Sequence, residues 1–151
     1  MDSHFKARVL QAFTEASRTR LHDAEREIAS LDEAARGETK SSAGDKYETA
    51  REMFAQARDL HRRAQESAAA NLEWLERQDP SLMRVSAGPG TLLRVDGGWI
   101  LMGPVPVSVE LDGIAVQGVS MQGPLGMALK GAKAGEKRPF RDRQVVVEIV
   151  L

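Results

Sequence analysis

The sequence predicts an α+β protein, in which a long N-terminal antiparallel α-helical coiled-coil hairpin precedes a small antiparallel β-sheet domain with one short helix. Every proline of the 151-residue chain lies at or beyond position 80, and the sequence before it is rich in strong helix formers. Beyond that point, short β-rich runs alternate with turn signals that contain glycine. We therefore expect a hairpin over residues 1–79, with its tip near 37–48, and a sheet domain over 80–151.

The first helix is expected from about Ser3 to Arg36. Its apolar and small residues recur at alternating steps of three and four, which is the spacing of a heptad seam. The seam positions are Leu10, Thr14, Ser17, Leu21, Ala24, Ile28, Leu31 and Ala35. Gly37 can end this helix, because glycine takes the left-handed conformation of a C-cap without steric cost.

The return helix is expected from about Asp45 to Gln78 and repeats the seam. Its seam positions are Tyr47, Ala50, Phe54, Ala57, His61, Ala64, Ala68, Asn71 and Leu75. The alanines allow two helices to approach closely, and the short tip requires them to run antiparallel. Asp79-Pro80 ends the helix, since a residue before proline is disfavoured in the helical region.

The second domain is expected to be a sheet with tight turns. Asp96-Gly97-Gly98 and Asp112-Gly113 are favourable for hairpins. The strands that they and other turns separate are Thr91 to Val95, Trp99 to Met102, Val105 to Leu111, Ile114 to Val119 and Gln144 to Leu151. The last of these is apolar enough to be central. Pro124 and Gly131 suit the start and end of a short helix.

Composition excludes several functions. The formal net charge of −1 argues against a general nucleic-acid coat, which needs a cationic excess. The absence of cysteine excludes disulfides, thiolate metal sites and a cysteine nucleophile. The first residues do not resemble a signal peptide, and no apolar run approaches the ~20 residues that cross a bilayer. We expect a cytoplasmic protein without membrane contact.

Two carboxylates three residues apart, Asp45 and Glu48, mark the start of the second helix. One interpretation is a capping box, with Asp45 as N-cap and Glu48 reaching back, worth ~1 kcal/mol. The other is a metal site, because hard carboxylate oxygens are ligands that Mg²⁺ accepts. The two interpretations are compatible, since a capping carboxylate keeps free lone pairs.

Two motifs connect the chain to a known family. The segment P-L-G-M-A-L-K-G-A-K-A-G spans Pro124 to Gly135, and Y-E-T-A-R-E spans Tyr47 to Glu52. With the hairpin and sheet in this order, they resemble the Gre-type transcript cleavage factors of bacterial RNA polymerase over almost the whole chain. The resemblance implies an FKBP-like C-terminal domain that docks at the rim of the polymerase secondary channel and a coiled coil that reaches the active site.

The resemblance also implies a chemistry for the tip. Asp45 and Glu48 would place a Mg²⁺ shared with the polymerase, which then cleaves the 3′ end of backtracked nascent RNA. The protein would be an accessory factor and not an enzyme by itself. Ser41-Ser42-Ala43-Gly44 depart from the family pattern, and if they are an insertion, Glu38 is the positional match for the family's aspartate.

Two alternatives and the oligomeric state stay open. A Gre-like regulator could occupy the channel and inhibit without cleavage. Peptidyl-prolyl isomerase activity is disfavoured, because such pockets are lined with aromatics and only Trp99 and Phe140 lie beyond Pro80. We expect a monomer in the free state, although the exposed edges of the hairpin leave self-association open.

The remaining charged groups have ordinary interpretations beside functional ones. His4, His22 and His61 lack the spacing of zinc ligands. Four arginines of the return helix have two interpretations: they form a solvated helical face, or they contact the channel walls or the RNA. These are Arg51, Arg58, Arg62 and Arg63. Four basic residues near the C-terminus also have two interpretations: they are solubilising charges, or they dock on an acidic polymerase surface. These are Lys130, Lys133, Lys137 and Arg138.

Overall fold

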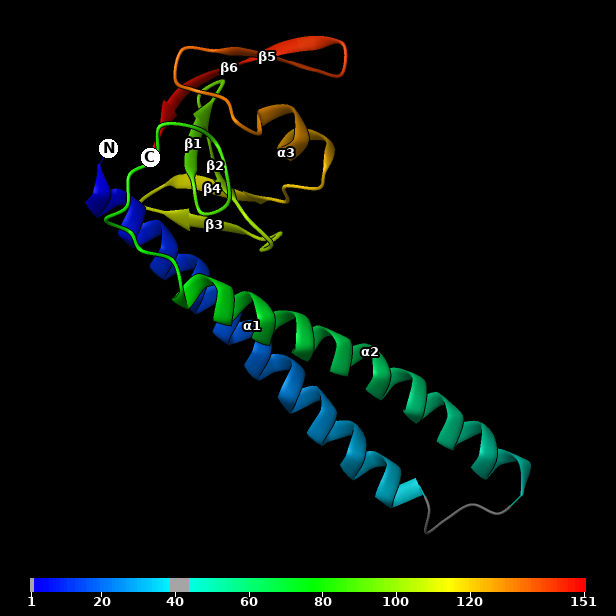
Figure 1. Ribbon diagram of the computed structural model, residues 1–151. Helices are drawn as coiled ribbons and strands as arrows, with labels where there is room; N and C mark the ends of the chain where they lie inside the picture. The colour runs from blue at the N-terminus through cyan, green and yellow to red at the C-terminus, as the bar shows by residue number, and fades with distance from the viewer. Residues whose placement is uncertain (1, 39–43) are drawn as a thin grey trace. The chain divides into compact units, whose positions relative to one another are not determined.

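The computed structural model describes residues 2–38 and 44–151, apart from the side chains of Glu38 and Asp45. The helices are α1 (Ser3–Glu38), α2 (Asp45–Glu76) and α3 (Pro124–Leu129) (Figure 1). The strands are β1 (Leu92–Val95), β2 (Gly98–Met102), β3 (Ser108–Leu111), β4 (Ile114–Val119), β5 (Lys137–Phe140) and β6 (Arg143–Val150). The α+β class is confirmed. Among the described residues no helix is long and apolar enough to cross a membrane.

The chain divides into two compact units. Residues 1–16 and 73–151 form one, called here the sheet unit, and residues 17–72 form the other, called the helical unit. Helices α1 and α2 each run through both units. The expected domain boundary at residues 79 and 80 follows the end of α2, whereas the sheet unit also includes the first turns of α1 and the last turn of α2.

In the helical unit, α1 and α2 lie side by side and antiparallel (Figure 1). The predicted seam residues of both helices, in this unit and beyond it, are buried or half-buried, with one exception. Ala64 is exposed, and Gln65 is half-buried in its place. Steps of three then four, or four then three, between His61 and Ala68 fit 3.6 residues per turn equally well, so the sequence pattern left this choice open.

The sheet has the strand order β3-β4-β2-β1-β6-β5. Four strand pairings are antiparallel, as predicted, but β2 and β4 pair in parallel because the chain crosses over between them to form β3. Strand β6 lies inside the sheet between β1 and β5, as its apolar sequence predicted. Both predicted Asp-Gly turns form, with positive φ at Asp96 and Gly97 (47° and 81°) and at Asp112 and Gly113 (53° and 77°).

Each face of the sheet has its own apolar core. On one face, Phe5, Val9 and Phe13 of α1 pack against residues that include Trp99 and Leu101. The ring centroids of Phe5 and Trp99 are 4.9 Å apart, with the planes inclined at 60°. On the other face the core is formed by a second set: Ala87, Leu93, Val95, Ile100, Met102, Val119, Leu129, Ala132, Val145 and Val147. The sheet unit is therefore packed on both sides.

Two polar residues anchor the start of α1. The Asp2 carboxylate accepts hydrogen bonds from the backbone N–H groups of His4 (3.1 Å) and Phe5 (3.2 Å), so Asp2 is the N-cap. The bond from Phe5 lowers the pKa of the Asp2 carboxyl. Lys6 is buried, and its Nζ donates to the backbone carbonyls of Leu82 (2.8 Å) and Leu151 (3.2 Å). Desolvation lowers the pKa of this ammonium group.

Candidate functional site

The start of α2 holds the two acids that the sequence singled out. Gly44 has φ +78°, and its carbonyl accepts hydrogen bonds from the N–H groups of Tyr47 (3.1 Å) and Glu48 (3.4 Å). A residue with non-helical φ whose carbonyl accepts the first helical bonds is an N-cap. Gly44 thus takes the capping position that the capping-box interpretation gave to Asp45. Asp45 is the first helical residue, and Glu48 lies three positions beyond it.

This position suits carboxylates for two reasons. The N-terminus of a helix carries partial positive charge, so an acid in its first turn contributes about 0.3–1 kcal/mol at an exposed site. Asp45 and Glu48 are separated by 300° around the helix axis, or 60° in the other sense, and so share one side of α2. With Gly44 at the N-cap, Glu48 is the fourth helical residue and not the third, so it does not occupy the capping-box position.

The predicted metal ligands are described to different degrees. The Glu48 side chain is exposed. Glu38 is the last residue of α1 and Asp45 the first of α2, but both side chains lie outside the described part, as do residues 39–43 with the predicted tip residues Ser41 and Ser42. Within the described residues no three His, Asp or Glu side chains gather as a metal site would require. The metal assignment of Asp45, Glu48 and Glu38 remains a prediction.

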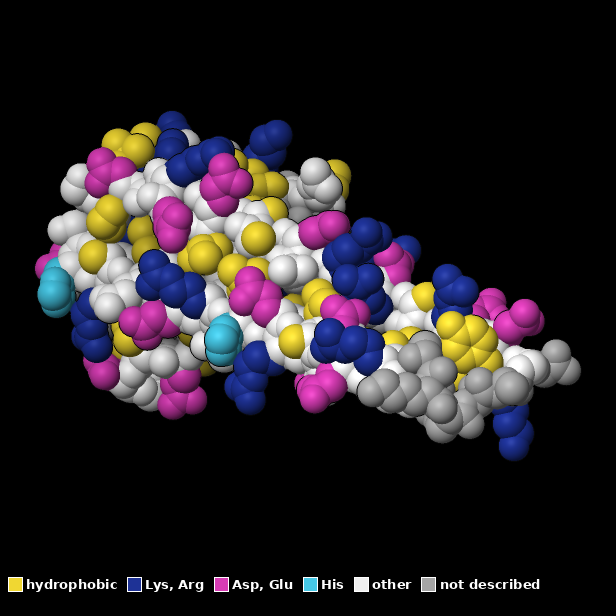
Figure 2. All heavy atoms as spheres, turned by 90° about the horizontal axis from the view of Figure 1, so that it is seen from below, with side chains coloured by type: hydrophobic (Ala, Val, Ile, Leu, Met, Phe, Trp, Pro, Cys, Tyr) yellow, Lys and Arg dark blue, Asp and Glu magenta, His cyan; other side chains and the backbone are white. Residues whose placement is uncertain are grey.

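The arginines of α2 are largely paired. Arg58 Nε lies 3.1 Å from the Asp32 carboxylate on α1, and Arg62 and Arg63 both contact Asp59, at 2.8 and 2.9 Å. On the face shown in Figure 2, Lys and Arg side chains are interspersed with Asp and Glu along the helices. These pairs agree with the solvated-face interpretation. Arg51 is exposed and has no ion pair with another described residue.

Other residues singled out by the sequence occupy ordinary positions. Tyr47 and His61 are half-buried in the seam of α2, where packing was expected. His4 and His22 are exposed on α1. None of the three histidines belongs to a metal-binding group within the described part of the chain.

The basic C-terminal stretch contains a strand that the sequence did not predict. Strand β5 pairs with β6 through a turn at Arg141, whose φ is +57°. Lys137 begins the strand and Pro139 lies inside it, and both are typical of protected edge strands, so a signal was present. Lys and Pro at alternate positions could have identified it.

The charges of this stretch divide into paired and unpaired groups. The Glu136 carboxylate accepts a bond from the Lys133 backbone N–H (3.2 Å) and pairs with Arg138 (2.8 Å), and both interactions lower its pKa. Arg143 pairs with Asp96 at 3.1 Å. Three lysines have exposed side chains without an ion pair among the described residues: Lys130, Lys133 and Lys137. Of the four predicted docking bases, these three are the available ones.

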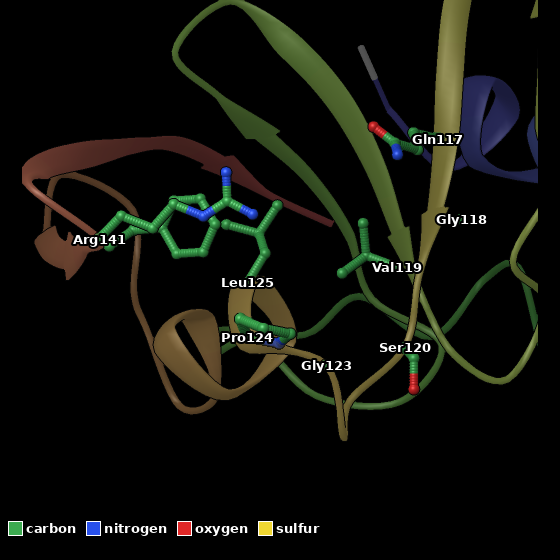
Figure 3. A pocket seen from close by; sticks show the side chains of 9 residues that line it. Gln117, Gly118, Val119, Ser120, Gly123, Pro124, Leu125 and Arg141 are labelled. Atoms are coloured by element: carbon green, nitrogen blue, oxygen red, sulfur yellow. The ribbon is translucent and has the colours of Figure 1, made fainter.

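A hollow of about 370 Å³ opens where the end of β4, the start of α3 and the β5–β6 turn meet (Figure 3). Its lining residues are Gln117, Gly118, Val119, Ser120, Gly123, Pro124, Leu125, Phe140 and Arg141. Phe140 contributes the one aromatic ring of this set, and the Arg141 guanidinium lies 5.0 Å from its centroid. Trp99 is instead buried in the core. The hollow therefore lacks the aromatic lining that an isomerase pocket would need.

Comparison with known proteins gives little direct information. No protein-family model and no curated protein matches the chain. Among solved structures, one described as the structure of the transcription factor Gfh1 is similar over 92% of this chain and 93% of that chain, with 16% sequence identity and a TM-score of 0.39. A likeness this weak has no bearing on function.

Proposed function

We propose that the chain is a Gre-type transcription factor that inserts its helical hairpin into the secondary channel of bacterial RNA polymerase. The observation that carries the proposal is the order of its parts. Two helices of 36 and 32 residues are joined by a connection that leads directly to the acids Asp45 and Glu48. They are followed by a sheet in which the P-L-G-M-A-L segment forms α3. In such a protein the two carboxylates are distant in sequence from the residues that form the packed core.

Asp45 and Glu48 are the residues that we propose hold the metal, with Glu38 as the alternative first ligand. The described geometry supports this role for Glu48, because its exposed carboxylate has no ion pair with another described residue. Carboxylate oxygens in a water-accessible position bind Mg²⁺ while leaving several water ligands in place. When bound, the ion would lower the pKa of a coordinated water for hydrolysis of a phosphodiester of the backtracked RNA 3′ segment.

The proposal assigns the protein a positioning role, in which it supplies ligands and the polymerase supplies the active site. Gly44 supports this assignment, since it occupies the N-cap position, where its carbonyl accepts the first bonds of α2 from Tyr47 and Glu48, and neither acid takes that position. The sheet domain, from Leu82 to Leu151, would hold the factor on the polymerase. Lys130, Lys133 and Lys137 would meet an acidic surface there.

A second candidate function keeps the binding and removes the cleavage. In it, the protein occupies the channel as a regulator or inhibitor of transcription. The departure of the tip from the family pattern at Ser41–Gly44 favours this candidate, because an insertion there would change where Asp45 lies relative to the polymerase metal.

Backtracked RNA polymerase complexes test both candidates. We expect the wild-type protein to accelerate shortening of the transcript 3′ end in Mg²⁺, and the Asp45→Ala/Glu48→Ala variant to lose that acceleration while still binding. Glu38→Ala identifies whether the alternative acid takes part, and Glu66→Ala, an exposed acid elsewhere on α2, is the matched control. Binding without acceleration by the wild type would support the channel regulator, and absence of binding would refute both.

A further inference from the structure

Helix α2 carries a second row of exposed apolar side chains, along the flank of its seam. Met53 and Leu60 are large hydrophobic residues with 65% and 66% of their surface exposed, and Ala64 is exposed as well. Steps of seven and four residues place the three on one face, since the helix has 3.6 residues per turn. We call this face the outer stripe. Gln56 and Ser67 also lie on it. The seam residues beside it are half-buried and face α1.

Opposite charges flank the outer stripe near its two ends. Glu52 precedes Met53, and Arg63 precedes Ala64, so both lie on the same flank, three helical turns apart. Both side chains are exposed, that of Arg63 by 75%. Asp59 lies between them on this flank and pairs with Arg62 and Arg63. The midpoint between the acid and the base falls between Ala57 and Arg58, and the midpoint between Met53 and Leu60 falls between Gln56 and Ala57.

We propose that the outer stripe pairs with the outer stripe of a second copy of this chain, antiparallel and about a twofold axis near Gln56. In this arrangement Met53 of each copy faces Leu60 of the other, and Glu52 of each copy faces Arg63 of the other. Residues on the same flank of antiparallel helices meet in this way, and a twofold axis repeats each contact. The surface is therefore complementary to itself.

The charges decide between orientations of the second copy. In a parallel pair opposite flanks meet, so Glu52 and Arg63 of the two copies would lie on opposite sides of the interface and would not contact each other. Only the antiparallel pair brings Glu52 of each copy to Arg63 of the other. Since each copy contributes only two large apolar side chains, the dimer is weak and depends on concentration. It differs from the monomer expected from the sequence. It does not rest on the proposed function, because it involves neither the tip acids nor the sheet unit, but dimerisation and channel insertion would compete, since both use the hairpin.

Sedimentation equilibrium of the full chain, from about 10 μM to 1 mM, measures the association. We expect the average mass to rise with concentration and Leu60→Glu to weaken dimerisation at least about tenfold. Val85→Glu introduces the same charge at an apolar residue that is 82% exposed in the sheet unit, and should leave dimerisation unchanged. A chain that stays monomeric throughout, or one that both variants affect equally, would overturn the proposal.

A charge exchange tests the orientation. Chains that carry Glu52→Arg alone or Arg63→Glu alone should each associate less than the wild type. A 1:1 mixture of the two should recover the dimer, because every flanking contact then joins opposite charges. A mixture of Glu110→Arg and Lys130→Glu chains, which have the same net charges, is the control and should gain nothing. Failure of the first mixture to recover the dimer would exclude the antiparallel pairing.

Because the chain contains no cysteine, a single introduced thiol can locate the axis. Gln56→Cys lies near the proposed twofold and should form a disulfide-linked dimer under mild oxidation. Ser67→Cys lies on the same exposed stripe but three turns away, and should not. Circular dichroism checks that both variants keep their helices. Equal crosslinking of the two variants would contradict the proposed register.

Discussion

The two units of the molecule are stabilised by different kinds of burial. The side chains with least exposure in the sheet unit are mostly large, among them Phe13, Leu92, Leu101, Met102 and Leu129. Those buried in the helical unit are small or polar: Ser17, Ala24, Ala68 and Asn71. The Ser17 hydroxyl is buried with no hydrogen-bond partner in the described residues. Since stabilisation follows the apolar area buried, about 25 cal/mol per Å², most of it comes from the sheet unit.

This difference indicates that the helical unit exposes most of its side chains to solvent and encloses few of them. A seam whose fully buried residues are small or polar, and whose large apolar residues are only half-buried, permits close approach of two helices but removes little apolar surface from water. We therefore expect amides of the helical unit to exchange with solvent through openings of lower free energy than those of the sheet. The proposed metal ligands and the outer stripe both lie on this less stable part.

The largest expected difference between the two units is in the unfolding free energy lost when one core residue of each is truncated. Phe13→Ala removes a fully buried ring from the sheet unit and should cost about 3–5 kcal/mol of unfolding free energy. Ile28→Ala removes a half-buried side chain from the seam and should cost about 1 kcal/mol. Urea unfolding followed by circular dichroism measures both. Equal losses would show that the seam contributes as much as the sheet core and would end the comparison.

Glycine substitutions test how closely the sheet unit is packed. A Cβ built on Gly118 would lie 1.8 Å from the Val105 carbonyl oxygen, so Gly118→Ala must displace backbone and should cost about 3 kcal/mol or more. Gly88 has open space around its Cβ position and an ordinary φ, so Gly88→Ala should be neutral or stabilise by up to about 1 kcal/mol. Thermal unfolding of both variants gives the contrast. If the Gly118→Ala variant were as stable as the wild type, the backbone at Gly118 and Val105 could move apart at little cost in free energy.

Lys6 gives the sheet unit a distinctive dependence on pH. Burial lowers its pKa in the folded protein, whereas the unfolded chain keeps the ordinary value of 10.5. Between the folded and unfolded values the unfolded state binds more protons, so the free energy of unfolding should rise with pH across that window. Lys6→Met should cost about 1 kcal/mol at pH 7, by leaving the carbonyls of Leu82 and Leu151 without this donor.

The measurement is urea unfolding of wild type and Lys6→Met at several pH values up to about 10.5. The stability difference between them should grow with pH, because only the wild type carries the titrating group. Lys130→Met, at an exposed lysine, should show a difference that does not change. A Lys6→Met difference that stayed constant or decreased would contradict the direction of the pKa shift.

Local sequence signals predicted a turn or a helix correctly where a single local requirement determines its backbone conformation. The two Asp-Gly turns require positive φ, and this requirement alone identifies them. The helices follow from a periodic seam without proline. The parallel pairing of β2 with β4 depends on where the chain returns after a crossover, which no local pattern specifies. Strand β5 was missed because its four residues carry two charges and a proline.

The candidate site was predicted less completely than the fold. Sequence spacing identified Asp45 and Glu48, but it could not show that Gly44 would cap α2 with its own carbonyl. It also assigned Ala64 to the seam, because alanine is the less polar of two neighbours that fit the period equally. The structure turns Ala64 outward, on the same face as Leu60, and so extends the outer stripe beyond Leu60.

The smallest expected effect concerns the ion pair that joins the two helices. Arg58 and Asp32 are 58% and 43% exposed, so solvent screens their attraction, and a double-mutant cycle with alanine at both positions should give a coupling of about 0.2–1 kcal/mol. The coupling should fall as salt is raised, since exposed charges are screened within about 10 Å at 0.1 M. Hydrogen exchange of the α1 and α2 amides provides the readout. A coupling well above 1 kcal/mol that persists in high salt would mean that charges hold the helical unit together, and that its weak apolar seam is not what limits its stability.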